Sequence, residues 1–504
     1  MHLSSLIEMV ESGFDDRVLL GDQNSRITGT DFGFLVRLGS TQVRNKYASV
    51  VYVGENHALL PIALFAAAWA GVPFVPVNFR LEDRQLRSLI ERYPNSLVLT
   101  DPLTAARLEE LSPLILDDWL RGLSNIDLEE VGPIEPAEND DDVAVVLFTS
   151  GTTSEPKSAL LRHRHLMAYL LGSVEFGGAD DSEAVLVSVP SYHVAGIANM
   201  LSNLFAGRRL VYLSSFTAQE WLSRIADEKI THAMVVPTML SRIVEHLDGA
   251  VLSTSTLRTL SYGGAKVSER VIRQALQAFP TTGFVNAYGL TETASTIAVL
   301  GPDDHRNALT SDDPMIQRRL SSVGRVLPMV EIEIRDDHER AVGPGESGLI
   351  YLRGEQVSGE YAGGNLLDGD GWFCTRDQGF IDSDGYLFIE GRVDDTIIRG
   401  GENIAPAEIE EVLLAQPGVA EACVVGLPDD EWGQRVVAVV VQQDGRTVEP
   451  NILQDAVRKV LRGSKTPEEI IVRDSLPHTE TGKMLRRVVQ SELLAAKEEL
   501  QHDS

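Results

Sequence analysis

Short apolar runs rich in β-branched residues alternate with amphipathic helical stretches along most of this 504-residue chain. Runs that predict strands include SVVYVG (49–54), SLVLT (96–100), AVLVSVP (184–190), RRLVYL (208–213) and HAMVVP (232–237). Strands that alternate with helices are typical of α/β folds, in which helices cover the faces of a sheet. The alternation therefore predicts α/β layers as the main architecture.

The pattern changes after about residue 330. The segments VEIEIRD, GLIYLRG and GYLFIEG alternate apolar and polar residues between Gly and Asp turns, which predicts antiparallel strands. Beyond them, APAEIEEVLLAQPGV predicts a helix, and two later apolar segments predict strands of a small α+β domain. A chain of this length also exceeds what one core supports. We expect a large multi-layer N-terminal domain with a small β subdomain over 1–393, and a small α+β C-terminal domain over 394–504.

One stretch, 58–77, carries no charge and is long enough to span a bilayer. Pro61, Gly71, Pro73 and Pro76 interrupt it, which instead predicts a short helix, a turn and a short strand. We expect a buried helix–strand unit and no membrane span.

The charge balance excludes two classes of partner. Lys and Arg number 44 and Asp and Glu number 74, so the net charge is −30. Proteins that bind nucleic acids or anionic membranes carry basic surfaces, so neither partner is expected. The two cysteines, Cys374 and Cys423, make neither a disulfide framework nor a metal cluster. The N-terminal segment lacks the basic start and apolar core of a secretion signal, so we expect a cytoplasmic protein.

The segment LFTSGTTSEPKSALL (147–161) gathers small hydroxyl side chains, a glycine and Lys157 after the buried run VAVVLF (143–148). Backbone N–H groups, hydroxyls and one ammonium at the edge of a sheet favour anionic oxygens. Such runs are usually plain loops, but the preceding buried strand favours a phosphate-binding loop here. It is not the P-loop of NTPases, because the pattern G-x-x-x-x-G-K-[ST] is absent.

Further polar clusters follow expected strands. SYHVAGI places His193 among apolar neighbours, and SYGGAK contains a glycine pair that a flat ligand can approach closely. NAYGLTET combines Tyr288, two threonines and Glu292, and WFCTRDQGF carries Asp377. Taken singly, a core histidine, a polar strand exit and a turn or N-cap also explain these residues.

Taken together and in order, these segments resemble the adenylate-forming superfamily of acyl-CoA synthetases (AMP-dependent synthetases and ligases), peptide-synthetase adenylation domains and beetle luciferases. TSGTTSEPK is similar to its phosphate-binding motif, NAYGLTET to its adenine and metal motif, and Asp377 to its ribose-binding aspartate. GRVDDTIIRGGENIAPAEIEEVL (391–413) resembles its hinge and thioester-forming segment, and LPHTETGKMLRR (476–487) its catalytic-lysine motif. The resemblance covers about residues 45 to 490.

The resemblance implies a two-step reaction. A carboxylate attacks the α-phosphorus of ATP, giving acyl-AMP and pyrophosphate, and a thiol then displaces AMP. The implied cofactors are ATP, Mg²⁺, and CoA or the phosphopantetheine of a carrier protein. The resemblance also implies that the small domain is mobile and rotates about Asp394, so that Lys483 serves the first step and Gly401 the second.

The resemblance assigns roles to individual residues. The pyrophosphate would be held by Thr149, Ser150, Gly151, Thr152, Thr153 and Lys157, the adenine by Gly264, Ala265, Asn286, Ala287, Tyr288 and Gly289, the ribose by Asp377 and Arg392, and the pantetheine by Gly401. The catalytic residues would be Lys483, His193, Thr291 and Glu292. Glu292 suits Mg²⁺ because an ionised carboxylate is a hard oxygen ligand, and Asp377 can accept both ribose hydroxyls. His193 would lie between carboxylate and phosphate, and Lys483 would bridge the attacking carboxylate and the ribose or phosphate oxygens as a point charge.

Three positions depart from the family pattern. Ser154 and Ser158 stand where the family usually has glycine, so the phosphate loop is expected to be stiffer or differently shaped. Arg376 replaces the glycine of the usual Thr-Gly-Asp. Three outcomes stay open for this arginine: it points to solvent, contacts a phosphate, or tunes the motion of the loop.

We expect an ATP-dependent carboxylate–CoA ligase of fatty acid metabolism, because RGGENIAPAEIEEVL most resembles the fatty acyl-CoA branch. The segments expected to form the acyl pocket (191–200, 261–266 and 286–297) contain Lys266 as their one lysine or arginine, which favours a small-molecule carboxylic acid with an uncharged tail. A first alternative is transfer to an acyl-carrier protein docked on Arg458, Lys459, Arg462 and Lys465. A second is a non-catalytic nucleotide-binding protein on the same fold. A homodimer is a further arrangement that the sequence leaves open.

Overall fold

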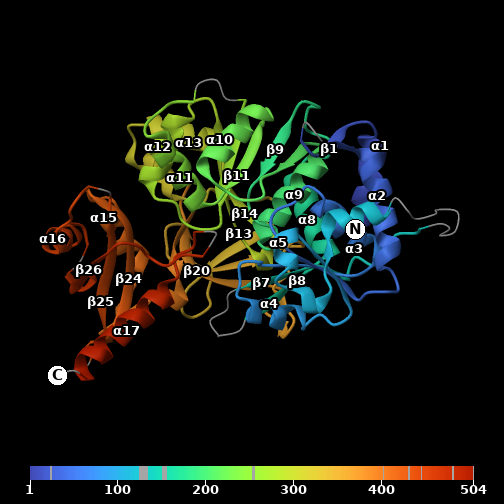
Figure 1. The fold of residues 1–504 in the computed structure, drawn as a ribbon. Helices are drawn as coiled ribbons and strands as arrows, with labels where there is room; N and C mark the ends of the chain where they lie inside the picture. Colours follow the sequence, from blue (N-terminus) through green and yellow to red (C-terminus); the bar gives the residue numbers. More distant parts are fainter. Residues whose placement is uncertain are drawn as a thin grey trace.

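The computed structural model of the chain describes residues 1–22, 25–123, 134–149, 156–252, 256–400, 402–429, 432–443, 445–461, 463–479 and 482–502. Within these residues the chain forms a large N-terminal domain with two large sheets and a smaller one, and a small C-terminal domain (Figure 1). The predicted fold class is confirmed.

The first large sheet carries the predicted phosphate loop. In the described part of the chain it has eight strands in the order β19-β18-β8-β7-β4-β3-β5-β6. Their bounds are β3 Ser49–Val53, β4 Phe74–Val77, β5 Ser96–Thr100, β6 Leu114–Ile115, β7 Val143–Thr149, β8 Lys157–Arg162, β18 Glu360–Tyr361 and β19 Gly364–Asn365. Strands β7 and β8 are antiparallel, whereas β7, β4, β3 and β5 run parallel.

The second large sheet carries the predicted adenine motifs. Its nine described strands lie in the order β15-β14-β13-β12-β11-β9-β10-β1-β2. Their bounds are β1 Val18–Leu20, β2 Ile27–Thr28, β9 Ala184–Val187, β10 Arg209–Tyr212, β11 His232–Val235, β12 Thr259–Gly263, β13 Gly283–Leu290, β14 Ser295–Leu300 and β15 Arg325–Val326. The central strands from β10 to β13 are parallel, so their carboxyl ends share one edge of the sheet.

Helices fill the space between the two large sheets and cover their outer faces. Alternate residues of each strand face opposite sides: Val50 and Val185 pack into the core between the sheets, whereas Val51 and Leu186 pack outward. The shared core also takes residues from α1 (Ser4–Gly13), α2 (Gly29–Val43), α3 (Leu60–Ala70), α8 (His163–Ser173) and α9 (Val194–Ala206). The outer faces pack against α4 (Asp83–Ile90) on one sheet, and against α10 (Ala218–Asp227), α11 (Pro237–Leu247) and α12 (Glu269–Ala278) on the other.

The apolar stretch 58–77 is the buried helix–strand unit that its prolines predict. Helix α3 ends at Gly71, which has φ of +78°, and β4 follows. No helix among the described residues is long and apolar enough to cross a membrane.

A four-stranded antiparallel sheet, β16-β17-β20-β21, completes the described part of the large domain. Its strands are β16 Glu331–Arg335, β17 Gly348–Arg353, β20 Phe373–Ile381 and β21 Leu387–Arg392, which confirms the antiparallel prediction. Its core includes Ile297 and Ala298 of β14, which ties it to the nine-stranded sheet. The turn η4 (Val393–Asp395) follows β21 and leads into the small domain.

The small domain lies beside the large one, with β20 near the junction (Figure 1). It contains the strand pair β22 (Ile397–Arg399) and β23 (Glu402–Ile404) and the sheet β24 (Val419–Asp429), β25 (Gly433–Gln442) and β26 (Glu469–Arg473). Helices α15 (Pro406–Leu414) and α16 (Pro450–Val460) contribute to the core on one face of that sheet, and α17 (Arg486–His502) covers the other. The limits 1–393 and 394–504 stay a prediction that the position of η4 supports.

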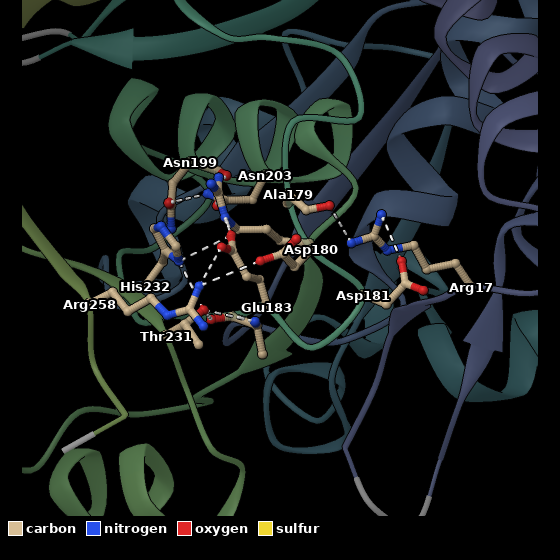
Figure 2. Close-up of polar contacts among 12 residues, drawn as sticks. Arg17, Ala179, Asp180, Asp181, Glu183, Asn199, Asn203, Thr231, His232 and Arg258 are labelled. Atoms are coloured by element: carbon tan, nitrogen blue, oxygen red, sulfur yellow. Dashed lines mark hydrogen bonds and ion pairs between the residues drawn. The ribbon is translucent and has the colours of Figure 1, made fainter. Parts of the chain in front are cut away.

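The amino ends of the parallel strands hold a polar network of their own. Figure 2 shows Glu183, which precedes β9, between His232 at the start of β11 and Arg258 before β12. The Glu183 carboxylate accepts hydrogen bonds of 2.7 Å from Arg208 and 3.0 Å from Arg258. These ion pairs connect neighbouring strands at their amino ends, at the edge of the sheet opposite to the carboxyl ends that carry the predicted adenine motifs.

Candidate active site

The predicted phosphate loop joins β7 to β8. Thr149 and Lys157 are paired across this antiparallel hairpin, so both lie where the loop meets the sheet. The predicted phosphate-binding residues Ser150, Gly151, Thr152 and Thr153, together with Ser154, lie outside the described residues. Ser158 is buried on β8, with its hydroxyl 3.4 Å from that of Tyr93.

Tyr361 of β18 connects the phosphate loop to the predicted metal ligand. Its hydroxyl donates a hydrogen bond to Glu292 Oε1 and lies 3.4 Å from Thr149 Oγ1, while Lys157 Nζ lies 6.0 Å from its ring centroid. Burial and the Glu292 carboxylate raise the pKa of Tyr361, so the phenol stays protonated and remains a donor. Sequence reasoning missed this residue, because no local pattern marks a tyrosine that lies 69 positions from Glu292.

Glu292 lies in the tight turn η2 (Thr291–Thr293) between β13 and β14. Its backbone carbonyl accepts hydrogen bonds from the N–H groups of Ser358 and Gly359, at 2.8 and 3.0 Å, which fixes the turn. The described residues contain no group of three or more potential metal ligands. A single carboxylate suits Mg²⁺, which usually takes one or two carboxylates and completes its shell with substrate phosphates and water.

The carboxyl edge of β12 and β13 brings the two predicted adenine segments together. Asn286, Ala287, Tyr288 and Gly289 lie on β13, and Gly264 and Ala265 directly follow the neighbouring parallel strand β12. Gly264 has φ of +92°, and a Cβ built on it would meet no atom within 4 Å. The backbone there is open to a ligand, as the glycine pair predicts. Asn286 is held by a 3.3 Å hydrogen bond from Nδ2 to the Ser322 carbonyl.

Asp377 is held between Tyr288 and Arg392. The Tyr288 hydroxyl donates a 2.5 Å hydrogen bond to Oδ2, and Arg392 Nε lies 3.1 Å from Oδ1. Burial raises the pKa of Asp377, while Arg392 and the Tyr288 hydrogen bond act in the opposite direction. Burial and Asp377 both raise the pKa of Tyr288 well above its usual value. The carboxylate thus has a fixed orientation before any ribose arrives.

A bulge in β20 explains how Asp377 reaches this position. Tyr351 pairs with Cys374 but Leu349 pairs with Gln378, so β20 has two more residues than β17 over this span. Arg376 lies inside the bulge with φ of +63°, in the left-handed region that favours glycine. Bulges commonly re-aim a side chain next to an active site. The glycine usual at this position in the family therefore matches the backbone, although this chain has an arginine.

Lys483 reaches the site from the small domain. Its side chain is still open to solvent, but desolvation and the nearby Arg392 lower its pKa, while Asp377 and Glu292 favour its charged form. The adjacent Gly482 has φ of +78°, and a Cβ on it would come within 2.4 Å of the Thr238 side chain on α11. Only glycine allows this approach between the domains, so it sets how deeply Lys483 enters.

His193 occupies the N-cap position of α9, six residues beyond the end of β9, and its side chain makes no capping hydrogen bond. Its Nε2 is buried and has no hydrogen-bond partner among the described residues, which is unusual for a polar atom in a protein interior. Burial, and secondarily the positive charge of Arg80, lower the pKa of His193 to about 4, so the imidazole is neutral at pH 7. Arg80 is a cation near the expected carboxylate position that sequence reasoning did not place there, because it precedes His193 by more than a hundred residues.

The remaining predicted residues have different outcomes. Thr291 lies beside Glu292 in η2. Gly401 lies outside the described residues, although its neighbours form the hairpin of β22 and β23. Lys266, predicted as the one spare cation, pairs with Glu411 of the small domain at 3.0 Å.

Two family models match the chain. The model of the AMP-binding enzyme covers residues 35–362, and the model of the AMP-binding enzyme C-terminal domain covers residues 408–483. The first spans all strands of the two large sheets except β1, β2 and β19, and the second ends at Lys483.

The chain is also similar to named enzymes. It is 33% identical to an indoleacetate–CoA ligase of Aromatoleum aromaticum, over 89% of this chain and 88% of that protein. It is 32% identical to a fatty acid–[acyl-carrier-protein] ligase of Streptomyces coeruleorubidus, over 87% of this chain and 85% of that protein. Among solved structures, the o-succinylbenzoate CoA synthetase of Bacillus subtilis, in complex with its acyl-adenylate intermediate, superposes with a TM-score of 0.82 at 25% identity, over 96% of this chain and 97% of that one.

Proposed function

The chain belongs to the AMP-binding enzyme family, and we propose that it joins a carboxylic acid with an uncharged tail to coenzyme A at the expense of ATP. In the first step a carboxylate oxygen bonds to the α-phosphorus of ATP and pyrophosphate leaves. In the second, the sulfur of coenzyme A bonds to the acyl carbon, AMP leaves, and the thiol proton passes to solvent. AMP-forming acid–thiol ligases are the enzyme class of the relatives.

One observation carries this proposal: charged side chains from three separate segments, Lys483, Asp377 and Glu292, lie close enough to influence one another. Lys483 of the small domain lies close enough to Asp377 and Glu292 for their charges to favour its protonated form. Asp377 supplies an acceptor for the ribose hydroxyls, Glu292 a hard ligand for Mg²⁺, and Lys483 a cation for the developing negative charge. Preorganised charges of this kind stabilise a phosphoryl-transfer transition state because they need no reorganisation during the reaction.

The neutral His193 fits a role at the attacking carboxylate. An imidazole with a buried, unpartnered Nε2 can donate or accept one hydrogen bond without adding charge. A substrate oxygen placed there would satisfy an atom that the protein leaves without a partner.

The acyl acceptor is the point at which relatives differ. The carrier-protein alternative needs an exposed basic patch on α16 and the turn after it. In the described residues, Arg458 is paired with Asp455 at 2.6 Å and Lys465 with Glu408 at 2.5 Å, and Arg462 lies outside them. Two of the four cations are thus paired and attract an acidic partner weakly, which favours coenzyme A, although Lys459 is exposed.

A panel of acids tests the proposal. Indole-3-acetate, ferulate, medium- and long-chain fatty acids and a dicarboxylate are each incubated with ATP and Mg²⁺, with coenzyme A, an acyl-carrier protein, or neither, and pyrophosphate and thioester are measured. We expect pyrophosphate release with at least one monocarboxylate and thioester formation with coenzyme A. If thioester forms with the carrier protein and not with coenzyme A, the carrier protein is the acceptor. A preference for the dicarboxylate would overturn the uncharged tail and implicate Arg80, and pyrophosphate release with none of the acids would overturn the proposal for these acid classes.

A further inference from the structure

Two neighbouring aspartates in the turn between the domains are paired with opposite domains. Asp394 Oδ1 accepts a 2.5 Å hydrogen bond from Arg376 of β20 in the large domain. Asp395 Oδ2 lies 3.6 Å from Nε of Arg486, at the start of α17 in the small domain. The junction therefore has one charged contact to each side, and only the contact of Asp394 crosses back to the large domain.

Arg376 occupies an unfavourable backbone position to make this contact. Its φ of +63° lies where side chains with a Cβ are disfavoured, and arginine is not among the residues that adopt it readily. Its neighbour Asp377 is directed into the site, whereas the Arg376 guanidinium extends to the junction turn. Backbone outliers of this kind persist when surrounding contacts hold them, and they cluster at functional sites.

The Arg376–Asp394 pair exists in the arrangement that places Lys483 in the active site. The same arrangement includes the close approach of Gly482 to Thr238 and the Lys266–Glu411 pair between the domains. Coenzyme A needs a path to the acyl carbon beside Lys483, so the small domain has to move before the second step. A backbone rotation at Asp394 would displace its carboxylate from Arg376, while Asp395 and Arg486 would travel together.

We propose that Arg376 is a positioning residue that stabilises the adenylation arrangement of the small domain through Asp394, and that this pair breaks when the domain rotates. The inference rests on the proposed two-step function. It gives this chain an ion pair at the domain junction that a glycine at position 376 could not form. Of the three outcomes open for Arg376, the structure favours control of motion, because its guanidinium is paired with Asp394 in the turn between the domains.

The test measures the arrangement directly and separately from catalysis. Spin labels are placed at two exposed positions, Glu91→Cys on the large domain and Lys459→Cys on the small one, in a Cys374→Ser background, and their distance distribution is recorded without nucleotide. The distributions of Arg376→Ala and Arg376→Lys are compared with that of the parent. The matched control is Arg353→Ala, which removes an exposed arginine paired with Glu331 inside the same four-stranded sheet.

We call the arrangement that places Lys483 in the active site the closed arrangement. We expect Arg376→Ala to lower the ratio of closed to rotated molecules by about two- to fivefold, because an exposed ion pair contributes modestly. Arg376→Lys should retain part of the closed population, and Arg353→Ala all of it. Raising the salt concentration should reduce the closed population of the parent more than that of Arg376→Ala, because salt screens exposed pairs and the variant retains the Lys266–Glu411 pair but not the Arg376–Asp394 pair. Single-turnover acyl-AMP formation should fall by a similar factor in Arg376→Ala, while thioester formation from supplied acyl-AMP should not fall.

If the distance distributions of Arg376→Ala and the parent coincide at low salt, the inference is wrong. An equal fall in both half-reactions would overturn it as well, because it would indicate a general structural role. Failure of the parent to activate any acid would instead count against the proposed function, and the distance comparison would still decide the role of Arg376.

Discussion

The hydroxyl of Tyr288 donates a 2.5 Å hydrogen bond to Oδ2 of Asp377, from a strand of the nine-stranded sheet to a bulge in the four-stranded one. The bond joins the residue expected beside adenine to the residue expected to bind ribose. The residues proposed to contact adenine and ribose are thus oriented against each other by the protein itself.

Replacing Tyr288 with phenylalanine tests this link. The ring remains available for stacking, but Asp377 loses the donor that holds its carboxylate. Because a hydrogen bond to a charged group contributes about 1.5 to 3 kcal/mol, part of which the ribose hydroxyls replace, we expect the KM for ATP to rise roughly three- to tenfold. The KM for the acid should change little. Equal KM values for ATP in variant and parent would contradict the role of this bond.

Lys483→Ala should slow acyl-AMP formation about a hundred- to thousandfold, because losing a positioned charge in the transition state costs about 3 to 4 kcal/mol. Thioester formation from supplied acyl-AMP should be retained, since the proposed role of the lysine is confined to the adenylation step. Stopped-flow assays of the two half-reactions measure both rates. Lys459→Ala, an exposed lysine on α16, serves as the matched control and should change neither. If the two half-reactions of Lys483→Ala slow equally, the lysine does not serve adenylation alone.

Glu292→Gln should raise the Mg²⁺ concentration needed for half-maximal adenylation, because a neutral amide is a poorer ligand for a hard dication. A magnesium titration of pyrophosphate release measures this shift. The control is Glu331→Gln, a surface glutamate of the four-stranded sheet. A titration curve that overlays that of the parent would show that another group binds the metal.

Asp394→Pro should form acyl-AMP at the same rate as Asp394→Ala, because both lack the carboxylate that pairs with Arg376, but it should transfer the acyl group much more slowly. Proline fixes φ near −65° and removes a backbone donor, so a residue that rotates between two conformations would be restricted to one. Asp394→Ala is the matched control, because it removes the carboxylate that pairs with Arg376 and leaves the backbone free. Single-turnover acyl-AMP formation and steady-state ligation are measured on one preparation. Normal transfer in the proline variant would show that rotation does not occur at Asp394.

Two histidines packed against each other predict an acid limit to stability. The rings of His2 and His163 lie 3.5 Å apart, and burial lowers their pKa values to about 4 and about 3. Between pH 6.5 and 4 the unfolded chain therefore binds protons that the folded protein does not, so the free energy of unfolding falls as the pH falls through this range. Each imidazole contributes a slope of up to about 1.4 kcal/mol per pH unit.

Urea denaturation at pH 7, 6 and 5 measures this slope. His163→Gln keeps an acceptor for the Leu3 N–H group but cannot be protonated, so its stability should decline less steeply than that of the parent. Parallel declines in the two proteins would show that these imidazoles do not set the acid limit.

Local sequence patterns determined most of the fold and supplied the candidate residues of the site. Strands such as 49–53 and 143–149 follow from apolar β-branched runs, and the prolines around α3 excluded a membrane span. Glu292 and Lys483 were proposed from short motifs, because a side chain and the turn that presents it are close in sequence. The burial of alternate strand residues follows from the same local periodicity.

Tertiary structure alone decided which distant side chains meet. Tyr361 joins Glu292 and Thr149, from which it is separated by 69 and 212 positions, and Arg80 lies near His193. Arg376 was visible in the sequence as a departure from the family, but its pairing with Asp394 depends on a two-residue bulge in β20. The physical reason is that a local pattern specifies backbone conformation and burial, whereas a contact between separate elements depends on how sheets and domains pack, which residues far apart in the chain determine together.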